Sequence, residues 1–343
     1  MKKFILITIS FFCIIRLSAQ PDYQVLQEEH TKLGRLLYAI SNQYVDTVTL
    51  HKFVEKMVVN TLQQLDPHST YISAEDVDAS NEPFQGSFDG IGVEFNILND
   101  TLIVINAVSG GPSELVGIRS GDRIIKVGEE NIAGVGLKNQ HAFKLLRGPK
   151  GTKVELGIQR KDVKELLIFV VTRDKIPIHS VDVLYEISPG IVFVRLNKFA
   201  VTSVEEVRSG LAKLKNKPKA MILDLRSNSG GVLPVAIDLA DQFFEADKLL
   251  LYNEGANWRQ APDMSTGNGF FKEGKLAILI DEYSASASEI VSGAVQDWDR
   301  GVIIGRRSFG KGLVQQSVPL PDGSLIRLTV ARYHTPTGRA IQR

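Results

Sequence analysis

The sequence is poor in cysteine and in net charge, and each shortage excludes a class of protein. Cys13 is the single cysteine among 343 residues. It lies in an N-terminal segment that we expect to be removed, so neither a disulfide nor a cysteine nucleophile is expected in the mature chain. Forty basic residues balance 39 acidic ones, for a net charge of +1. Composition therefore gives no indication of the basic face that usually binds nucleic acid, and no nucleic-acid partner is predicted.

Long apolar runs are also missing beyond the N-terminus. The chain opens with MKK, continues with an apolar run from Phe4 to Ile15, and then reads RLSAQ. A basic start, a short apolar run and a small residue near its end are typical of a secretory signal peptide. We expect residues 1–19 to be cleaved after Ala19, which predicts an exported protein. The alternative is an uncleaved anchor, although a membrane span needs roughly 20 apolar residues.

Residues 20–82 are predicted to be helical. Apolar residues recur at helical spacing in TVTLHKFVEKMVVNTLQQLDPHS, where Thr49 could cap the start and Pro67 fits the stop. His68 is expected in a loop, because no second metal ligand stands at ligand spacing. Amphipathic helices of this kind could join two subunits into a homodimer, or they could cover the protein's own core.

Residues 83–175 change character, with frequent glycines and short β-like runs such as GIGVEFNI, LIVINAV and RIIKV. The pieces DGIGVEF and IRSGDRIIKVGEENI make this module resemble a PDZ domain. The resemblance implies that the loop of Gly90, Ile91, Gly92 and Val93 presents backbone N–H groups to the C-terminal carboxylate of a peptide. Glycines allow such close approach, and an extended peptide could then add to the sheet edge. The alternative is that these glycines only shape a β-turn. Arg147, in LLRGPKG, is a candidate link between domains.

From residue 176 to residue 343, buried strands alternate with helices. AMILDLRSN, KLAILID and GVIIG read as strands, whereas LPVAIDLADQFF and SASEIVSGAVQDW read as helices. Continuous apolar strands separated by helices indicate an α/β core. The whole chain is therefore predicted to be an α+β multidomain protein, with a helical N-terminal region and a PDZ-like β module before this core.

Three serines, Ser284, Ser286 and Ser288, crowd one strand-to-helix junction in DEYSASASEI. A nucleophile placed there would gain access to substrate and the field of the helix N-terminus. However, Ser286 and Glu289 also form the Ser-x-x-Glu pattern of a capping box. Taken alone, this stretch favours a helix cap.

Two glycine-rich turns accompany the serines. In DLRSNSGGVL, the N–H groups of Gly230 and Gly231 could form an oxyanion hole, a phosphate nest or a plain tight turn. In GRRSFGKG, Lys311 sits almost as in a phosphate-binding loop, but Gly312 replaces the hydroxyl residue that would hold Mg²⁺. A lysine can instead serve as a base for a serine when burial keeps its amine neutral.

The run YSASASEIVSGAVQD followed by FGKGLVQQ resembles the carboxy-terminal processing peptidases, the tail-specific proteases of family S41. LDPHSTYIS resembles the N-terminal region of that family, and DLRSNSGGVLP follows the PDZ-like module in the family's order. The resemblance covers nearly the whole mature chain. It implies a core of the ClpP/crotonase type and no metal or other cofactor.

Carried over by position, the resemblance makes Ser286 the nucleophile and Lys311, 25 residues later, its general base. Gln315 takes the place of the residue that orients the lysine. These three residues are the expected catalytic set.

The remaining site residues also follow from the resemblance. Ala287 and the Gly230-Gly231 turn would supply the oxyanion N–H groups, while Glu289 and Asp297 match supporting positions. The chain departs from the family at Ser308, where threonine is common, and it stops at TPTGRAIQR, where the family normally continues. We therefore expect a C-terminal piece to be missing.

The resemblance implies an exported serine endopeptidase of the bacterial cell envelope, most simply the periplasm. Its partners would be proteins or peptides with accessible C-termini. Two alternatives stay open: a catalytically silent PDZ-containing scaffold that binds peptides, and a CoA-dependent enzyme of the crotonase architecture. The Ser286, Lys311 and Gln315 set argues against the first, and the PDZ-like module and export segment argue against the second.

Overall fold

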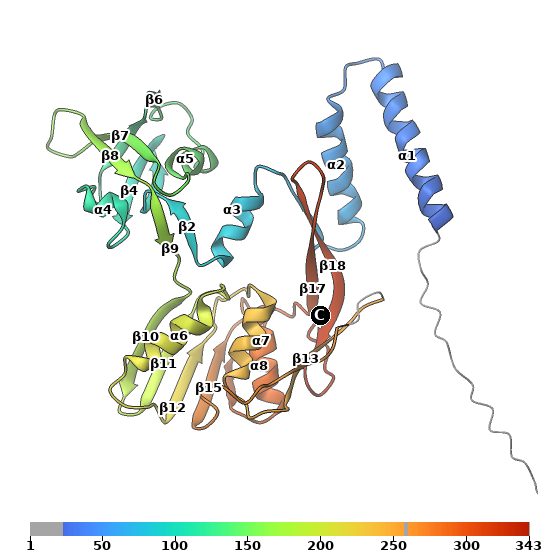
Figure 1. The fold of residues 1–343 in the computed structure, drawn as a ribbon, viewed down its shortest axis with the longest axis vertical. Coiled ribbons are helices and arrows are strands. Elements are labelled where there is room, and N and C mark those ends of the chain that lie inside the picture. Colours follow the sequence, from blue (N-terminus) through green and yellow to red (C-terminus); the bar gives the residue numbers. More distant parts are fainter. Residues whose placement is uncertain (1–22, 257–259, 343) are drawn as a thin grey trace, which may run out of the picture.

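The computed structural model describes residues 23–256 and 260–342, so the predicted signal peptide and Cys13 lie outside the described residues. Four sheets and their helices form three parts, which follow one another along the chain (Figure 1). The α+β class predicted from the sequence is confirmed. No helix among the described residues combines the length and the apolar character needed to cross a bilayer.

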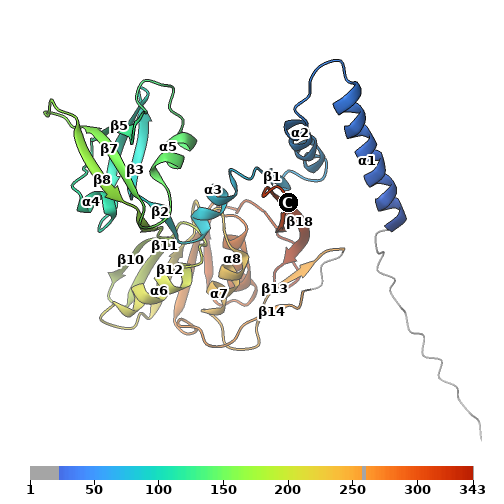
Figure 2. The same ribbon diagram turned by 45° about the horizontal axis from the view of Figure 1, so that its top comes forward.

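The N-terminal part is an arm of two helices, α1 (Tyr23–Gln43) and α2 (Leu50–Gln63). Both views show α1 standing away from the rest of the molecule (Figures 1 and 2). None of the residues of α1 is buried, and α2 buries only Leu62. Thr49 does occupy the N-cap position of α2, but its side chain makes no capping hydrogen bond.

A short connecting segment joins the arm to the rest of the chain. Its elements are β1 (Thr70–Ile72), α3 (Val77–Asn81) and the 3₁₀ turn η1 (Glu82–Phe84). β1 pairs antiparallel with a strand near the C-terminus, with Thr70 opposite Arg327. The N-terminal region is therefore hydrogen-bonded to the end of the chain.

The second part is a six-stranded sheet with two short helices. A two-stranded neck, β2 (Ser87–Gly90) and β9 (Asp174–Pro177), marks where the chain enters and leaves it. The module has its own apolar core, which includes Ile91, Leu102, Ile124 and Leu156. Its elements are β3 (Val93–Leu98), β4 (Thr101–Ala107), α4 (Pro112–Leu115), β5 (Arg123–Val127), β6 (Glu130–Asn131), α5 (Asn139–Leu146), β7 (Lys153–Gln159) and β8 (Leu167–Thr172).

The third part is built on a five-stranded sheet in the order β10-β11-β12-β15-β16. β10 is antiparallel to β11, and the other neighbours are parallel. Helices α7 and α8 pack with the buried residues of β11, β12 and β15 in one apolar core. The elements are β10 (Val181–Ser188), β11 (Ile191–Leu196), α6 (Ser203–Ala212), β12 (Ala220–Asp224), α7 (Leu233–Asp241), β15 (Lys275–Ile280), α8 (Ala287–Asp297) and β16 (Val302–Gly305).

A further antiparallel sheet completes the core. Its strands are β13 (Leu249–Glu254), β14 (Asp263–Met264), β17 (Leu313–Pro319) and β18 (Leu325–His334), together with β1. β17 and β18 form a long hairpin whose tip reaches toward α2 (Figure 1).

Candidate active site

Three loops meet because they follow the carboxyl ends of three adjacent parallel strands. Residues 225–232 follow β12, residues 281–286 follow β15, and residues 306–312 follow β16. In parallel sheets this edge is where ligands usually bind. The three glycine- and serine-rich stretches of the sequence therefore come together at one edge of the sheet.

The three serines of DEYSASASEI have different surroundings. The Ser284 hydroxyl is buried and donates to the Leu225 carbonyl at 2.8 Å. The Ser288 hydroxyl is also buried and donates to the Asn228 carbonyl at 2.9 Å. Ser286 is only partly buried and lines a cleft. Of the three, Ser286 is the one placed to meet a ligand.

Ser286 has a strained backbone conformation at the N-cap of α8. Its φ is +55° and its ψ is −112°, in a region that costs a residue other than glycine about 1–3 kcal/mol. Such strain persists only where surrounding contacts impose it. Glu289 makes one of these contacts, because its carboxylate accepts a hydrogen bond from the Ser286 N–H at 2.8 Å.

Glu289 also holds the lysine loop. Its carboxylate accepts the N–H groups of Gly310 at 2.7 Å and of Lys311 at 2.8 Å. The side chain is buried. One carboxylate therefore fixes the backbones of both Ser286 and Lys311, which gives the predicted supporting residue a definite structural role.

Lys311 is partly buried in the cleft. Two effects lower the pKa of Lys311 below its ordinary value: burial is the larger, and the nearby positive charge of Arg327 is the smaller. Its Nζ donates to Gln315 Oε1 at 3.0 Å. Among the described residues no hydrogen bond joins this Nζ to the Ser286 hydroxyl.

The loop around Lys311 is shaped by its glycines. Gly310 has φ +90°. A Cβ on Gly312 would lie 2.4 Å from the Gln342 backbone nitrogen. Gly312 is thus required by packing against the C-terminal segment, which accounts for its presence where a phosphate-binding loop has a hydroxyl residue.

The Gly230-Gly231 turn packs directly against the serine. Gly230 has φ +106°, and a Cβ there would lie 2.9 Å from the Ser286 Cβ, so only glycine fits. The Gly230 N–H, predicted from the sequence to face an oxyanion, instead donates to Asn228 Oδ1 at 2.9 Å. Ala287 is the first residue of α8, and its N–H has no acceptor within the helix.

These residues share one cleft of about 1180 Å³. Ser286, Lys311, Gln315, Gly230 and Gly231 all line it. One wall is apolar and comes from the turn before α7 and the helix itself: Val232, Leu233, Pro234 and Ile237. An apolar wall beside a few convergent polar groups is the usual form of a site for an organic ligand.

Asp297 is not brought to this cleft. It lies at the far end of α8, where its carboxylate accepts the Thr337 N–H at 2.9 Å and pairs with Arg339. These contacts fasten the C-terminal loop to α8. Its support for the site is therefore at most indirect.

Two residues of β18 belong to the site and were missed in the sequence. Tyr333 is buried, donates to the Lys311 carbonyl and lines the cleft. Burial raises the pKa of the Tyr333 phenol, and the adjoining Ser286 hydroxyl partly opposes that rise. Arg327 also lines the cleft and donates to Asn81 Oδ1 at 3.0 Å. Both residues lie in the sequence of β18, where nothing distinguishes them from the other residues of a strand, so their place in the cleft could not be predicted from that sequence.

The loop from Gly90 to Val93 runs from the last residue of β2 to the first residue of β3. Gly92 has φ +72°, and a Cβ there would meet Ile176 Cδ1 at 2.9 Å. Ile91 is buried in the core of the module, whereas Val93 is only partly buried. The Arg147 guanidinium pairs with Glu82 at 2.5 Å, which links α5 of the module to the connecting segment.

Comparison with known proteins agrees with this architecture. Residues 190–343 match peptidase family S41, and residues 103–160 match the PDZ domain. The sequence is 33% identical over 317 residues to a carboxy-terminal-processing protease of Bartonella bacilliformis, covering 91% of this chain and 72% of that protein.

A second relative and a solved structure extend the likeness. The chain is 33% identical over 324 residues to a probable CtpA-like serine protease of Staphylococcus aureus, covering 92% of this chain but only 63% of that protein. The chain thus spans somewhat less than two thirds of this relative. The photosystem II D1 C-terminal processing protease superposes with a TM-score of 0.51 at 26% identity, covering 94% of this chain and 91% of that chain.

Proposed function

This chain belongs to peptidase family S41, and on that premise we propose that it is a serine endopeptidase that recognises protein C-termini through its PDZ domain and cleaves by a Ser-Lys mechanism. The observation that carries the proposal is the convergence of Ser286, Lys311 and Gln315 on one cleft. We place the domain limits at 20–82, 83–175 and 176–343.

In the proposed mechanism, neutral Lys311 takes the proton from the Ser286 hydroxyl as Oγ attacks the scissile carbonyl carbon. The N–H groups of Ala287 and Gly231 stabilise the negative charge on the carbonyl oxygen. Collapse of this intermediate gives the acyl-enzyme, and the leaving amine takes the proton from Lys311. Lys311 then removes a proton from water, whose oxygen attacks the ester carbon; the C–Oγ bond breaks, the acyl product leaves as the acid, and Ser286 Oγ takes the proton back from Lys311.

The arrangement of contacts around Lys311 supports its role as base. Burial favours the neutral amine, and Gln315 Oε1 holds Nζ within the cleft. Among the described residues, no three His, Cys, Asp or Glu side chains gather as a metal site. The proposed mechanism uses protein groups and water alone.

Tail recognition is proposed at the Gly90–Val93 loop. A peptide with a free C-terminal carboxylate and an apolar last residue is expected to be cut at least about tenfold faster than the same peptide amidated, because docking raises its local concentration at Ser286. The measurement is kcat/KM on the matched pair of peptides. Equal cleavage of the two by the wild-type protein would contradict tail recognition while leaving the Ser-Lys chemistry intact.

A matched pair of glycine variants locates that recognition. Gly92→Leu is expected to remove the preference for the free tail, because its Cβ meets Ile176 and displaces the carboxylate loop. Gly128→Leu is the control: its φ of +58° is equally unfavourable, but no atom lies within 4 Å of a Cβ there. The control should keep the preference.

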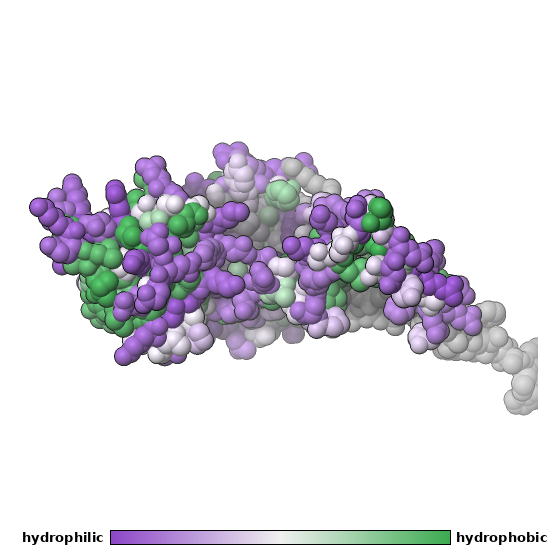
Figure 3. All heavy atoms as spheres, turned by 90° about the horizontal axis from the view of Figure 1, so that it is seen from above, coloured by the Kyte–Doolittle hydropathy of each residue, from purple (hydrophilic) through white to green (hydrophobic). Residues whose placement is uncertain are grey.

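We further propose export and dimerisation. Residues 1–19 have the pattern of a signal peptide, which would place the protein in the bacterial cell envelope. The apolar residues of α1 support a homodimer through the N-terminal helices, since Leu26 is 60% exposed and Tyr38 is 68% exposed. Figure 3 shows that the arm is otherwise largely hydrophilic, with hydrophobic residues gathered at the other end of the molecule.

One purification tests both proposals. Protein isolated from the envelope fraction of producing cells is expected to begin at Gln20 by mass spectrometry and to have the mass of a dimer by light scattering. An intact N-terminus would contradict cleavage, and a monomer would contradict dimerisation. Leu26→Glu, on the exposed face of α1, should dissociate the dimer without unfolding the core.

A further inference from the structure

The loop from Asp66 to Ser69, between α2 and β1, is held by its first residue. Asp66 Oδ1 accepts the N–H of His68 at 2.7 Å and of Ser69 at 2.8 Å, and Oδ2 accepts the Ser69 hydroxyl at 2.6 Å. Burial opposes ionisation of this carboxyl, but the hydrogen bonds outweigh it and lower the pKa of Asp66 below its usual value. The loop is therefore organised around a carboxylate.

The same carboxylate ties the loop to the protease core. The Thr329 hydroxyl of β18 donates to Asp66 Oδ1 at 3.1 Å, and the Thr329 N–H donates to the Ser69 hydroxyl at 3.1 Å. Thr329 lies opposite Gln315 in the β17–β18 hairpin. Asp66 thus sets the loop against the strand pair that carries Gln315.

The His68 carbonyl then orients the Gln315 amide. Gln315 Nε2 donates to this carbonyl, and Gln315 Oε1 accepts from Lys311 Nζ at 3.0 Å. A carbonyl can only accept, so it requires the NH₂ end of the amide on its own side. The oxygen end must then face Lys311, and a residue of the N-terminal region decides which end of Gln315 meets the lysine.

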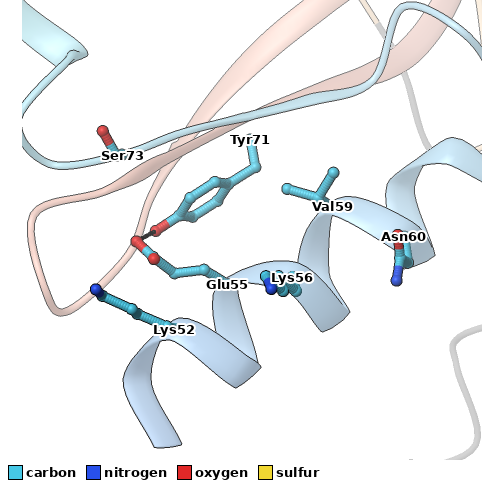
Figure 4. Close-up of a pocket in the computed structure, with 7 residues that line it drawn as sticks. All are labelled: Lys52, Glu55, Lys56, Val59, Asn60, Tyr71 and Ser73. Atoms are coloured by element: carbon cyan, nitrogen blue, oxygen red, sulfur yellow. Dashed lines mark hydrogen bonds between the residues drawn. The ribbon is translucent and has the colours of Figure 1, made fainter. Parts of the chain in front are cut away.

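Hydrogen bonds, rather than packing of the arm, hold this loop in place. Only Leu62 of α2 is buried. Beside the loop, residues of α2 and β1 line a pocket of about 460 Å³. Two of these residues are joined by a hydrogen bond from the Tyr71 hydroxyl to the Glu55 carboxylate at 3.0 Å (Figure 4). The contacts made by Asp66, together with the pairing of β1 and β18 just after the loop, therefore restrain the His68 carbonyl.

We propose that Asp66 is a positioning residue for the catalytic lysine: it fixes the His68 carbonyl, which orients Gln315, which holds Lys311 in the cleft. This inference rests on the proposed Ser-Lys function and assigns the N-terminal region a part in the active site. Asp66 itself does not line the cleft.

Asp66→Asn tests the proposal. The amide oxygen keeps the place of Oδ1, which accepts two backbone N–H groups and the Thr329 hydroxyl, and the NH₂ replaces Oδ2, so the bond donated by the Ser69 hydroxyl is lost and the loop loosens. Turnover of a tail peptide is expected to fall by roughly ten- to a hundredfold, as for a displaced catalytic group, with KM within about twofold of wild type. The acid limb of the kcat/KM profile should move to higher pH, because a better hydrated Lys311 has a higher pKa. The other charged or titratable groups around Lys311 are Arg327 and Tyr333 on β18, Glu289 on α8 and His68 in the loop itself, and this variant replaces none of them.

Three further variants separate positioning from general destabilisation. Asp46→Asn makes the same change at an exposed carboxylate of the arm and should match wild type. Thr329→Val removes the hydroxyl that bonds Asp66 and should reproduce the loss, whereas Thr329→Ser keeps it and should restore turnover. A wild-type pH profile and kcat in folded Asp66→Asn would overturn the inference. A protease in which Ser286→Ala or Lys311→Arg kept its activity would instead overturn the proposed function.

Discussion

Replacing Ser286 with alanine is expected to abolish proteolysis and to leave the fold intact. Loss of the nucleophile should lower kcat by at least about 10⁴-fold. The cost in stability should be below about 1 kcal/mol, because the bond that fixes this residue runs from its backbone N–H to Glu289 and survives in alanine. Digestion of a tail peptide and a thermal melt of the same preparation measure both effects.

The two neighbouring serines are the controls. Ser284→Ala and Ser288→Ala each remove one buried hydrogen bond, but the Leu225 and Asn228 carbonyls still accept the backbone N–H groups of Asn228 and Ala285, so each variant should lose only about 1 kcal/mol of stability. Turnover by the folded protein should stay within about tenfold of wild type. Activity in Ser286→Ala together with inactivity in folded Ser288→Ala would move the nucleophile to Ser288.

The elements that bear the site could be predicted from the sequence because each is a local pattern. Buried strands ending in glycine- or serine-rich turns mark residues 225–232, 281–286 and 306–312. Adjacent parallel strands bring such turns to one edge of a sheet. The choice among the three serines could not be made locally, because it depends on carbonyls of Leu225 and Asn228 about 60 residues away.

The rest of the site depends on contacts that no local pattern records. Gln315 meets the carbonyl of His68 across 247 residues of chain. Tyr333 and Arg327 point into the cleft from a strand whose alternation looks ordinary. The capping-box pattern at Ser286 was correctly identified, but its glutamate also binds the lysine loop. The helix-cap interpretation of that stretch therefore holds in the structure, and it is compatible with the proposed catalytic role of Ser286.

Lys311→Arg is expected to inactivate the protein although the positive charge is retained. Arginine stays protonated in proteins and cannot accept the Ser286 proton, so kcat should fall by a factor comparable with that of Ser286→Ala. Lys215→Arg, the same change at an exposed site, should have no effect. Substantial turnover by Lys311→Arg would exclude the general-base role. Mg·ATP affinity that disappeared in this variant would favour the phosphate-loop alternative.

The pH dependence of the wild-type protein gives an independent check on the same residue. Burial and Arg327 lower the pKa of Lys311, so the neutral, active form persists to lower pH than for an exposed lysine. The rate should fall as pH drops through that lowered pKa, because protonation removes the base. Arg327→Gln takes away one of the two causes, so its acid limb should move to higher pH. A rate that stayed constant while the Lys311 amine became protonated, followed by NMR of the labelled side chain, would show that another group accepts the serine proton.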